Sequence, residues 1–207
     1  MTHAVVSKPN RLVRSLKQLD AVPAFARGWA RNLVLRRAVP FTGTARLDFA
    51  VMTPERVEIA IANQHRVQNH IKGVHAAAMT LLAETATGMV VGMNVRDDCL
   101  PLAKELKVAF KKRAQGSLRA VATLTEAQRA LMQQSDKGEV AVPVQVSDES
   151  GAQPFAPVGN VAPGGCVGQG IALHCKPRAG HEKAALVRKV RIERVALHAR
   201  ALRHHAE

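Results

Sequence analysis

Asn69, His75 and Glu84 are the residues of this sequence whose types and spacing could do chemistry. Asn69 and His75 lie just before and at the start of a predicted helix, and Glu84 follows His75 by nine residues within an apolar run. A carboxylate in this setting can act as a general base or as a nucleophile. Because an α-helix rises about 1.5 Å per residue, His75 and Glu84 would lie about 13 Å apart along its axis. They could therefore serve one small reacting group only through a long substrate or a second copy of the chain.

Small residues flank Glu84 on one face of this helix, so we expect that a backbone or a slender ligand can approach it closely. The flanking positions on this face are Ala77, Thr80, Thr87 and Gly88. The opposite stripe is apolar and can bury against a sheet; it consists of Val74, Ala78, Leu81, Leu82 and Met89. Simpler interpretations stay open, because a helical Glu is often solvated, His75 could only cap the helix, and Asn69 is a common turn residue.

The elements around this helix predict an α+β fold in which an antiparallel sheet wraps around one long central helix. Alternating apolar and polar residues predict a hairpin before the helix. A polar loop over 94–101 and three or four strands follow it. The expected elements are strands 46–51 and 56–61, a helix over 74–92, strands 106–111, 118–124 and 139–146, and an irregular strand 153–162 that Pro154 and Pro157 weaken.

Basic segments lie on either side of this core. Residues 1–40 are expected to form a helical N-terminal extension, with a cationic amphipathic helix over 10–20 and a second helix over 24–38. Two interpretations of the first helix stand: packing on the domain with a solvated basic face, or peripheral contact with an anionic membrane or acidic partner. Residues 41–163 would form the folded domain. Residues 164–207 would be a basic C-terminal tail, helical or disordered, with no alternating pattern that would complete the sheet.

The composition narrows the classes of function. The net charge is +14 and the pI is about 10.7, but the excess lies in the two terminal segments and the middle of the chain is nearly neutral. Aromatic residues make up only 3% of the chain, which leaves little material for stacking on single-stranded nucleic acid. Three cysteines are too few for a disulfide scaffold, so we expect a reducing, cytoplasmic compartment.

Three kinds of segment or site are not expected. No apolar run is long enough for a transmembrane helix, and basic residues interrupt the N-terminal runs that a signal peptide would need. The spacing of cysteines and histidines matches no usual set of metal ligands. We therefore expect no metal site.

The order of the elements and the motif residues between 40 and 147 resemble hotdog-fold thioesterases. The likeness is closest to the PaaI-like (phenylacetyl-CoA thioesterase-type) branch and its uncharacterised bacterial relatives. That branch has an Asn six residues before a His that opens the central helix, and an acid nine residues after the His. Asn69, His75 and Glu84 match this spacing, and the run from Phe110 to Gly116 is similar to the family's next strand and turn.

The resemblance implies a hotdog fold that hydrolyses an acyl thioester at a site shared by two subunits, in a homodimer or a dimer of dimers. It implies that Glu84 is the catalytic carboxylate, that the backbone N–H of Ala76 binds the oxyanion, and that Asn69 and His75 position the thioester or the water. Coenzyme A, or an acyl-carrier protein, would hold the acyl group, and no separate cofactor is expected. Expected substrate contacts are Gly73, Ala77, Thr80, Gly88, Lys111, Lys112 and Arg113.

Two alternatives remain. The family often places a Ser or Thr at the start of the strand after the helix, whereas residues 101–104 carry no hydroxyl. This departure favours a non-catalytic hotdog protein that binds acyl-CoA or a lipid-like ligand. The high pI would also suit a basic nucleic-acid-binding protein, although the neutral core and scarce aromatic residues argue against it.

Overall fold

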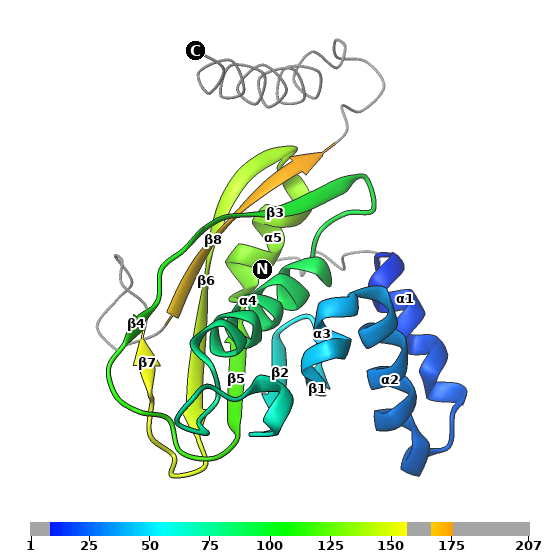
Figure 1. Cartoon of the computed structure of the whole chain (residues 1–207). Helices are drawn as coiled ribbons and strands as arrows, with labels where there is room; N and C mark the ends of the chain where they lie inside the picture. Colours follow the sequence, from blue (N-terminus) through cyan, green and yellow to red (C-terminus); the bar gives the residue numbers. More distant parts are fainter. Residues whose placement is uncertain (1–8, 157–166, 176–207) are drawn as a thin grey trace, which may run out of the picture. The chain divides into compact units, whose positions relative to one another are not determined.

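The computed structural model describes residues 9–156 and 167–175, and these contain one six-stranded antiparallel sheet with a long helix against one face (Figure 1). The sheet order is β1-β2-β5-β6-β8-β3, and β4 and β7 form a separate two-stranded ribbon. The strands are β1 (Asp48–Met52), β2 (Arg56–Ile61), β3 (Cys99–Leu106), β4 (Ala109–Phe110), β5 (Leu118–Thr123), β6 (Lys137–Asp148), β7 (Phe155–Ala156) and β8 (Val167–Cys175). The helices are α1 (Arg11–Gln18), η1 (Leu19–Ala21), α2 (Ala24–Ala38), α3 (Pro40–Ala45), η2 (His65–Val67), α4 (Ala76–Gly92) and α5 (Glu126–Gln134).

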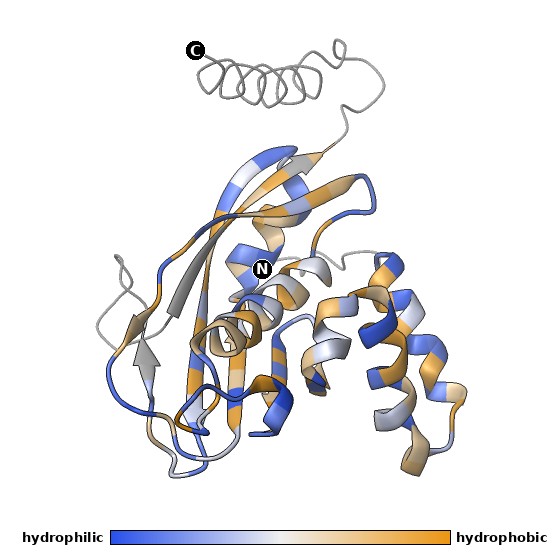
Figure 2. Cartoon of the chain, in the orientation of Figure 1, coloured by the Kyte–Doolittle hydropathy of each residue, from blue (hydrophilic) through white to orange (hydrophobic). Residues whose placement is uncertain are grey.

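The core lies between α4 and the sheet. Buried and more exposed side chains alternate along β5 and β6, so that one face of each strand is buried, and Figure 2 shows hydrophobic residues along both strands. On β2 the buried series is Val57, Ile59 and Ile61, and α4 packs against β2, β5 and β6. The predicted α+β fold with a sheet around a central helix is confirmed.

The N-terminal helices are attached to the end of α4. Asn10 caps α1 by accepting a hydrogen bond from Val13 N–H, and its Nδ2 donates to the carbonyls of Gly92 and Val95 at 2.7 and 2.6 Å. The backbone N–H of Arg11 and the guanidinium of Arg14 bind the Asp97 carboxylate, and these hydrogen bonds hold the pKa of Asp97 below its ordinary value. The cationic helix expected over 10–20 is therefore present and packs on the domain.

One strand is not where the sequence predicted it. The chain was expected to form a loop over 94–101 and a strand over 106–111, but β3 occupies 99–106 and only the short β4 follows. β3 is an edge strand, and most of its side chains are exposed. Edge strands tolerate prolines such as Pro101 and need no apolar alternation, so the sequence pattern concealed it.

A second correction concerns the region after residue 163, where no sheet strand was expected. β8 lies there, between β6 and β3, and it buries Ile171 and Leu173 in the core. Glycine at 168 and 170 interrupts the pattern that identifies a strand. The sheet therefore extends to Cys175. The rest of the predicted tail, 176–207, and most of the irregular strand predicted over 153–162 lie outside the described residues.

Cys99 and Cys175 are paired in register on β3 and β8 and form a disulfide. The pairing was not foreseen from the cysteine count, and the compartment of the protein stays a prediction. Among the helices that the structure describes, none combines the length and the apolar character needed to cross a bilayer.

Candidate functional site

The loop before α4 is built around Asn69. Its Oδ1 accepts hydrogen bonds from the backbone N–H groups of Ile71 (3.1 Å) and Gly73 (3.0 Å), and its own N–H donates to Gly73 O at 2.8 Å. Asn folds back on the following backbone in this way because its side chain is short and carries an acceptor. The amide Nδ2 of Asn69 has no hydrogen bond within the described part of the chain. Asn69 thus orders the turn, and the described residues leave its Nδ2 as a donor for a ligand.

His75 is the N-cap of α4. Its Nδ1 accepts a hydrogen bond from Ala77 N–H at 3.0 Å, so this imidazole carries its proton on Nε2 when it is neutral. His75 therefore does cap the helix, as the simpler interpretation expected, and the residue is exposed. The N–H of Ala76, the first residue of α4, has no hydrogen-bond partner among residues 9–156 and 167–175. Such an orphan amide at the positive end of a helix dipole is suited to a developing negative charge.

A cavity of about 190 Å³ opens beside this free amide. We call it the helix-start cavity. Arg113, at its rim, donates to Ile71 O at 3.0 Å and so connects the loop after β4 to the loop before α4. Five of the predicted site residues line the cavity: Asn69, Gly73, Ala76, Lys112 and Arg113.

A second cavity, of about 220 Å³, lies on the other side of the helix start. His75 and Ala77 line it, together with Gln68 and the exposed Phe41. The two cavities share no lining residue, so within one chain His75 and Ala76 line different cavities.

Glu84 lies two turns further along α4, half-buried and away from both cavities. Burial raises the pKa of its carboxyl, and a hydrogen bond with the Thr85 side chain opposes the rise. One carboxylate oxygen lies over Gly88, where an added Cβ would be 3.8 Å from it. Since α4 is unbroken from Ala76 to Gly92, the helix keeps Glu84 and His75 apart, as their spacing predicted.

The other predicted substrate contacts have mixed surroundings. Thr80 is half-buried and donates to Ala76 O at 3.0 Å. Lys111 is exposed, and its N–H donates to Pro154 O. Thr87, which was expected on the small-residue face around Glu84, is fully buried.

The sequence reasoning missed some residues that line the cavities. Met79 and the half-exposed Phe110 line the helix-start cavity, and Gln68 and Phe41 line the second one. Phe110 could have been noticed, because it directly precedes the basic run 111–113 that was singled out. Phe41 and α4 are far apart in the sequence, so no local sequence pattern predicts that they line the same cavity.

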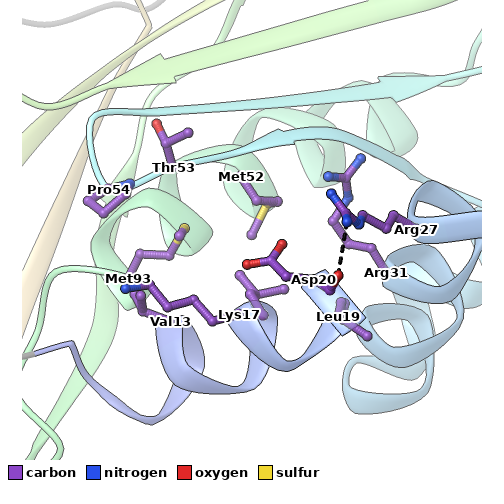
Figure 3. A pocket seen from close by; sticks show the side chains of 11 residues that line it. Val13, Lys17, Leu19, Asp20, Arg27, Arg31, Met52, Thr53, Pro54 and Met93 are labelled. Carbon is purple, nitrogen blue, oxygen red and sulfur yellow. Dashed lines mark hydrogen bonds between the residues drawn. The ribbon is translucent and has the colours of Figure 1, made fainter. Parts of the chain in front are cut away.

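A third cavity, of about 250 Å³, lies among the N-terminal helices and the turn between β1 and β2 (Figure 3). Methionines 52 and 93 and three cations, Lys17, Arg27 and Arg31, surround it. Arg27 donates to Asp20 O at 2.9 Å across its edge. None of the predicted site residues lines it, so it is separate from the candidate site.

Comparison with known proteins gives a family model and several solved structures. Residues 28–158 match the model of the domain of unknown function DUF4442. A protein of unknown function from Pseudomonas aeruginosa, described as a probable thioesterase, is 20% identical with a TM-score of 0.57, over 68% of this chain and 91% of that one. A putative thioesterase from Shewanella oneidensis is 10% identical with a TM-score of 0.56, over 79% and 99%. No curated protein matches this chain.

Two further similar structures are of one Staphylococcus aureus thioesterase. Each is 13% identical with a TM-score of 0.52 and covers 66% of this chain and 99% of that one. In one structure a Gln is replaced by Ala, and in the other a Glu 15 residues later is replaced by Ala. These likenesses confirm the hotdog fold. The assignment to the PaaI-like branch stays a prediction.

Proposed function

Because this chain belongs to the DUF4442 family and has the hotdog fold, we propose that it hydrolyses acyl thioesters. The observation that supports this most strongly is the start of α4. There the residues that line one cavity of about 190 Å³ include Ala76 and Asn69, whose backbone N–H and side-chain Nδ2 have no partner among the described residues, and the cations Lys112 and Arg113. Acyl transfer to water needs such donors for the oxyanion, together with a carboxylate that activates water or attacks the acyl carbon.

In the proposed reaction the thioester carbonyl lies in the helix-start cavity. Ala76 N–H and Asn69 Nδ2 donate to its oxygen, and the charge on that oxygen grows as the tetrahedral intermediate forms. Glu84 accepts a proton from the attacking water, the C–S bond breaks, and the proton passes to the thiolate, giving a carboxylic acid and a free thiol. Glu84 acting as a nucleophile would form an anhydride that water then cleaves, with the same products.

The catalytic carboxylate must come from a second subunit, because α4 holds Glu84 too far from its own chain's helix start. The face of α4 that the sheet leaves half-exposed or exposed suits this arrangement. It is small or apolar apart from Glu84, and it includes Ala77, Thr80, Leu81 and Gly88. We therefore propose a homodimer, or a dimer of dimers, in which Glu84 of each subunit meets Asn69, His75 and Ala76 of the other.

The proposed substrate is an acyl-CoA. Lys111, Lys112 and Arg113 are exposed at the end of β4, two of them at the rim of the helix-start cavity, where they can bind phosphate groups. Coenzyme A enters as part of the substrate, so the proposal needs no separate cofactor. An acyl-carrier protein presents a phosphopantetheine arm to the same groups and is the alternative donor.

The number of residues between Asn69 and Glu84 supports their assignment to one catalytic site. They are 15 residues apart, as are the Gln and the Glu that were replaced in the two Staphylococcus aureus structures. In both proteins an amide side chain precedes an acid by the same distance. What the two proteins share is the presence of a side-chain amide, Asn here and Gln there, 15 residues before a Glu.

The test is a Glu84→Gln variant assayed against a panel of acyl-CoA chain lengths. We expect kcat to fall by about a hundredfold or more, because the amide can neither accept the water proton nor attack the acyl carbon. The matched control is Glu126→Gln, the same change at an exposed position in the first turn of α5. A Glu84→Gln variant with the kcat of the wild type would refute the assignment of Glu84.

A non-catalytic acyl-CoA-binding protein is the second candidate. β3, the strand that follows α4, carries no Ser or Thr, whereas the enzymes that the sequence resembles often have one there. Calorimetry with the same acyl-CoA panel separates the two functions. Binding without turnover at every chain length would support the second candidate and exclude the first.

A further inference from the structure

Helix α2 exposes an apolar face. Phe25 is 92% exposed and Trp29 is 70% exposed, and Leu33 and Val34 are also open to solvent. Residues 25, 29 and 33 follow one another at intervals of four, so their side chains form one stripe along the helix. We call Phe25, Trp29 and Leu33 the α2 stripe. Large aromatic side chains gathered on one exposed face mark an interaction surface.

The stripe ends in a cation. Arg37, four residues after Leu33, continues the same line and is exposed. Its guanidinium makes no hydrogen bond or ion pair with any residue that the structure describes. Asp20 is the only acidic residue between Pro9 and Arg46, while α1 and α2 carry several exposed Lys and Arg residues. The whole segment is therefore strongly positive around an apolar stripe.

The neighbouring helix α1 cannot offer such a face. Its apolar residues Leu12, Val13 and Leu16 pack against the core, and Arg14 is held by Asp97 at 2.6 Å. The membrane contact that the sequence suggested for residues 10–20 thus lacks a free apolar side. Of these two helices, α2 is the one whose large apolar side chains are open to solvent.

We propose that the α2 stripe inserts into the interface of an anionic phospholipid bilayer. Trp and Phe are favoured at the level of lipid headgroups, and Lys and Arg near them attract an anionic leaflet. A second copy of the chain is the less favourable occupant, because it would bring two basic segments together with a single acid in each. The proposal does not depend on thioester hydrolysis.

Trp29 provides the test, because it is the only tryptophan of the chain. The full-length protein is titrated with phosphatidylcholine vesicles that contain about one third phosphatidylglycerol, and with pure phosphatidylcholine vesicles. We expect a blue shift of the emission and co-sedimentation with the anionic vesicles only, and weaker binding as salt is added.

Substitutions in the α2 stripe test whether these side chains cause the binding to vesicles. Phe25→Ser combined with Leu33→Ser keeps the reporter Trp29, and we expect at least a tenfold loss of vesicle affinity. Arg37→Glu should also weaken binding. Leu131→Ser, which changes an exposed leucine on α5, is the matched control and should bind as the wild type does.

Three results would overturn the proposal. The first is an emission that anionic vesicles do not change. The second is Trp29 emission that is already blue-shifted and protected from a soluble quencher in the protein alone, which would mean that the chain itself covers the stripe. The third is loss of a dimer in the Phe25→Ser/Leu33→Ser variant, measured by light scattering, which would assign the stripe to a contact between copies.

Discussion

At the start of α4 two adjacent residues have different roles. His75 caps the helix with its side chain, and the N–H of Ala76 has no partner in the described part of the chain. A cap normally satisfies only one of the first orphan amides, so the others stay available to a ligand. Ala76 itself lines the helix-start cavity.

Replacing Ala76 by proline removes this amide and little else. Proline is tolerated at the first position of a helix, and His75, with φ −66° and ψ 143°, already has the extended backbone that must precede a proline. We expect unchanged stability and a fall in kcat of about a hundredfold to a thousandfold, as for loss of an oxyanion donor. Steady-state kinetics and thermal unfolding measure the two effects.

The matched control is Ala24→Pro, which makes the same change at the first position of α2. It should leave both kcat and stability as in the wild type. An Ala76→Pro variant that stays folded and keeps full activity would show that this amide does not bind the oxyanion.

The raised pKa of Glu84 has a consequence for stability. Since burial favours the neutral carboxyl, the folded chain binds this proton more tightly than the unfolded chain does. The contribution of Glu84 to the free energy of unfolding is therefore complete below the unfolded pKa. It is lost as the pH rises through the higher folded pKa.

Urea unfolding of the wild type and of Glu84→Gln over a pH series measures this contribution. The difference in stability, wild type minus variant, should decrease as the pH rises past the ordinary pKa of a glutamate and then become constant. A difference that does not change with pH would mean that the carboxyl is solvated in both states.

At the scale of elements, β8 is the strand that joins the edge strand β3 to the rest of the sheet. It pairs with β6 on one side and with β3 on the other, and the Cys99–Cys175 disulfide joins its end to β3. Without β8, the edge strand β3 would have no partner in the sheet. The strand with the weakest sequence signal is thus the one that connects the edge to the rest.

Truncation distinguishes the sheet that the structure shows from the one that the sequence predicted. A chain that ends at residue 163 lacks β8, and we expect it to lose cooperative unfolding, because Ile171 and Leu173 leave the core and β3 is unpaired. A chain that ends at residue 175 is the control and should unfold cooperatively, since residues 1–175 form one compact unit. Circular dichroism during urea unfolding reports both. Equal stability of the two chains would contradict the role given to β8.

At the scale of the whole molecule, the proposed site exists only if two chains contribute to it. This can be tested by mixing two inactive variants, Glu84→Gln and Ala76→Pro, after partial unfolding and refolding together. Random pairing gives half heterodimers, each with one intact site of two, so we expect about a quarter of the wild-type activity. Each variant refolded alone is the control. A mixture no more active than these controls would show that Glu84 and Ala76 do not meet across subunits.

The sequence by itself determined the central part of this protein. The alternation of Val57, Ile59 and Ile61 fixed β2, and the apolar run before and after Glu84 fixed α4, because local periodicity is what one buried face imposes. The nine-residue spacing of His75 and Glu84 also determined that one chain cannot join them, since the rise of a helix is constant.

Only the tertiary structure decided the rest. β3 has few buried side chains, and glycines 168 and 170 interrupt the pattern of β8, so the place of both strands depends on strands far away in the sequence. The helix-start cavity joins Asn69, Ala76 and Arg113, which come from separate segments. The exposure of Phe25 and Trp29 likewise depends on which side of α2 the domain covers. Local sequence sets which face of an element is apolar, but the packing of distant elements sets which faces remain open.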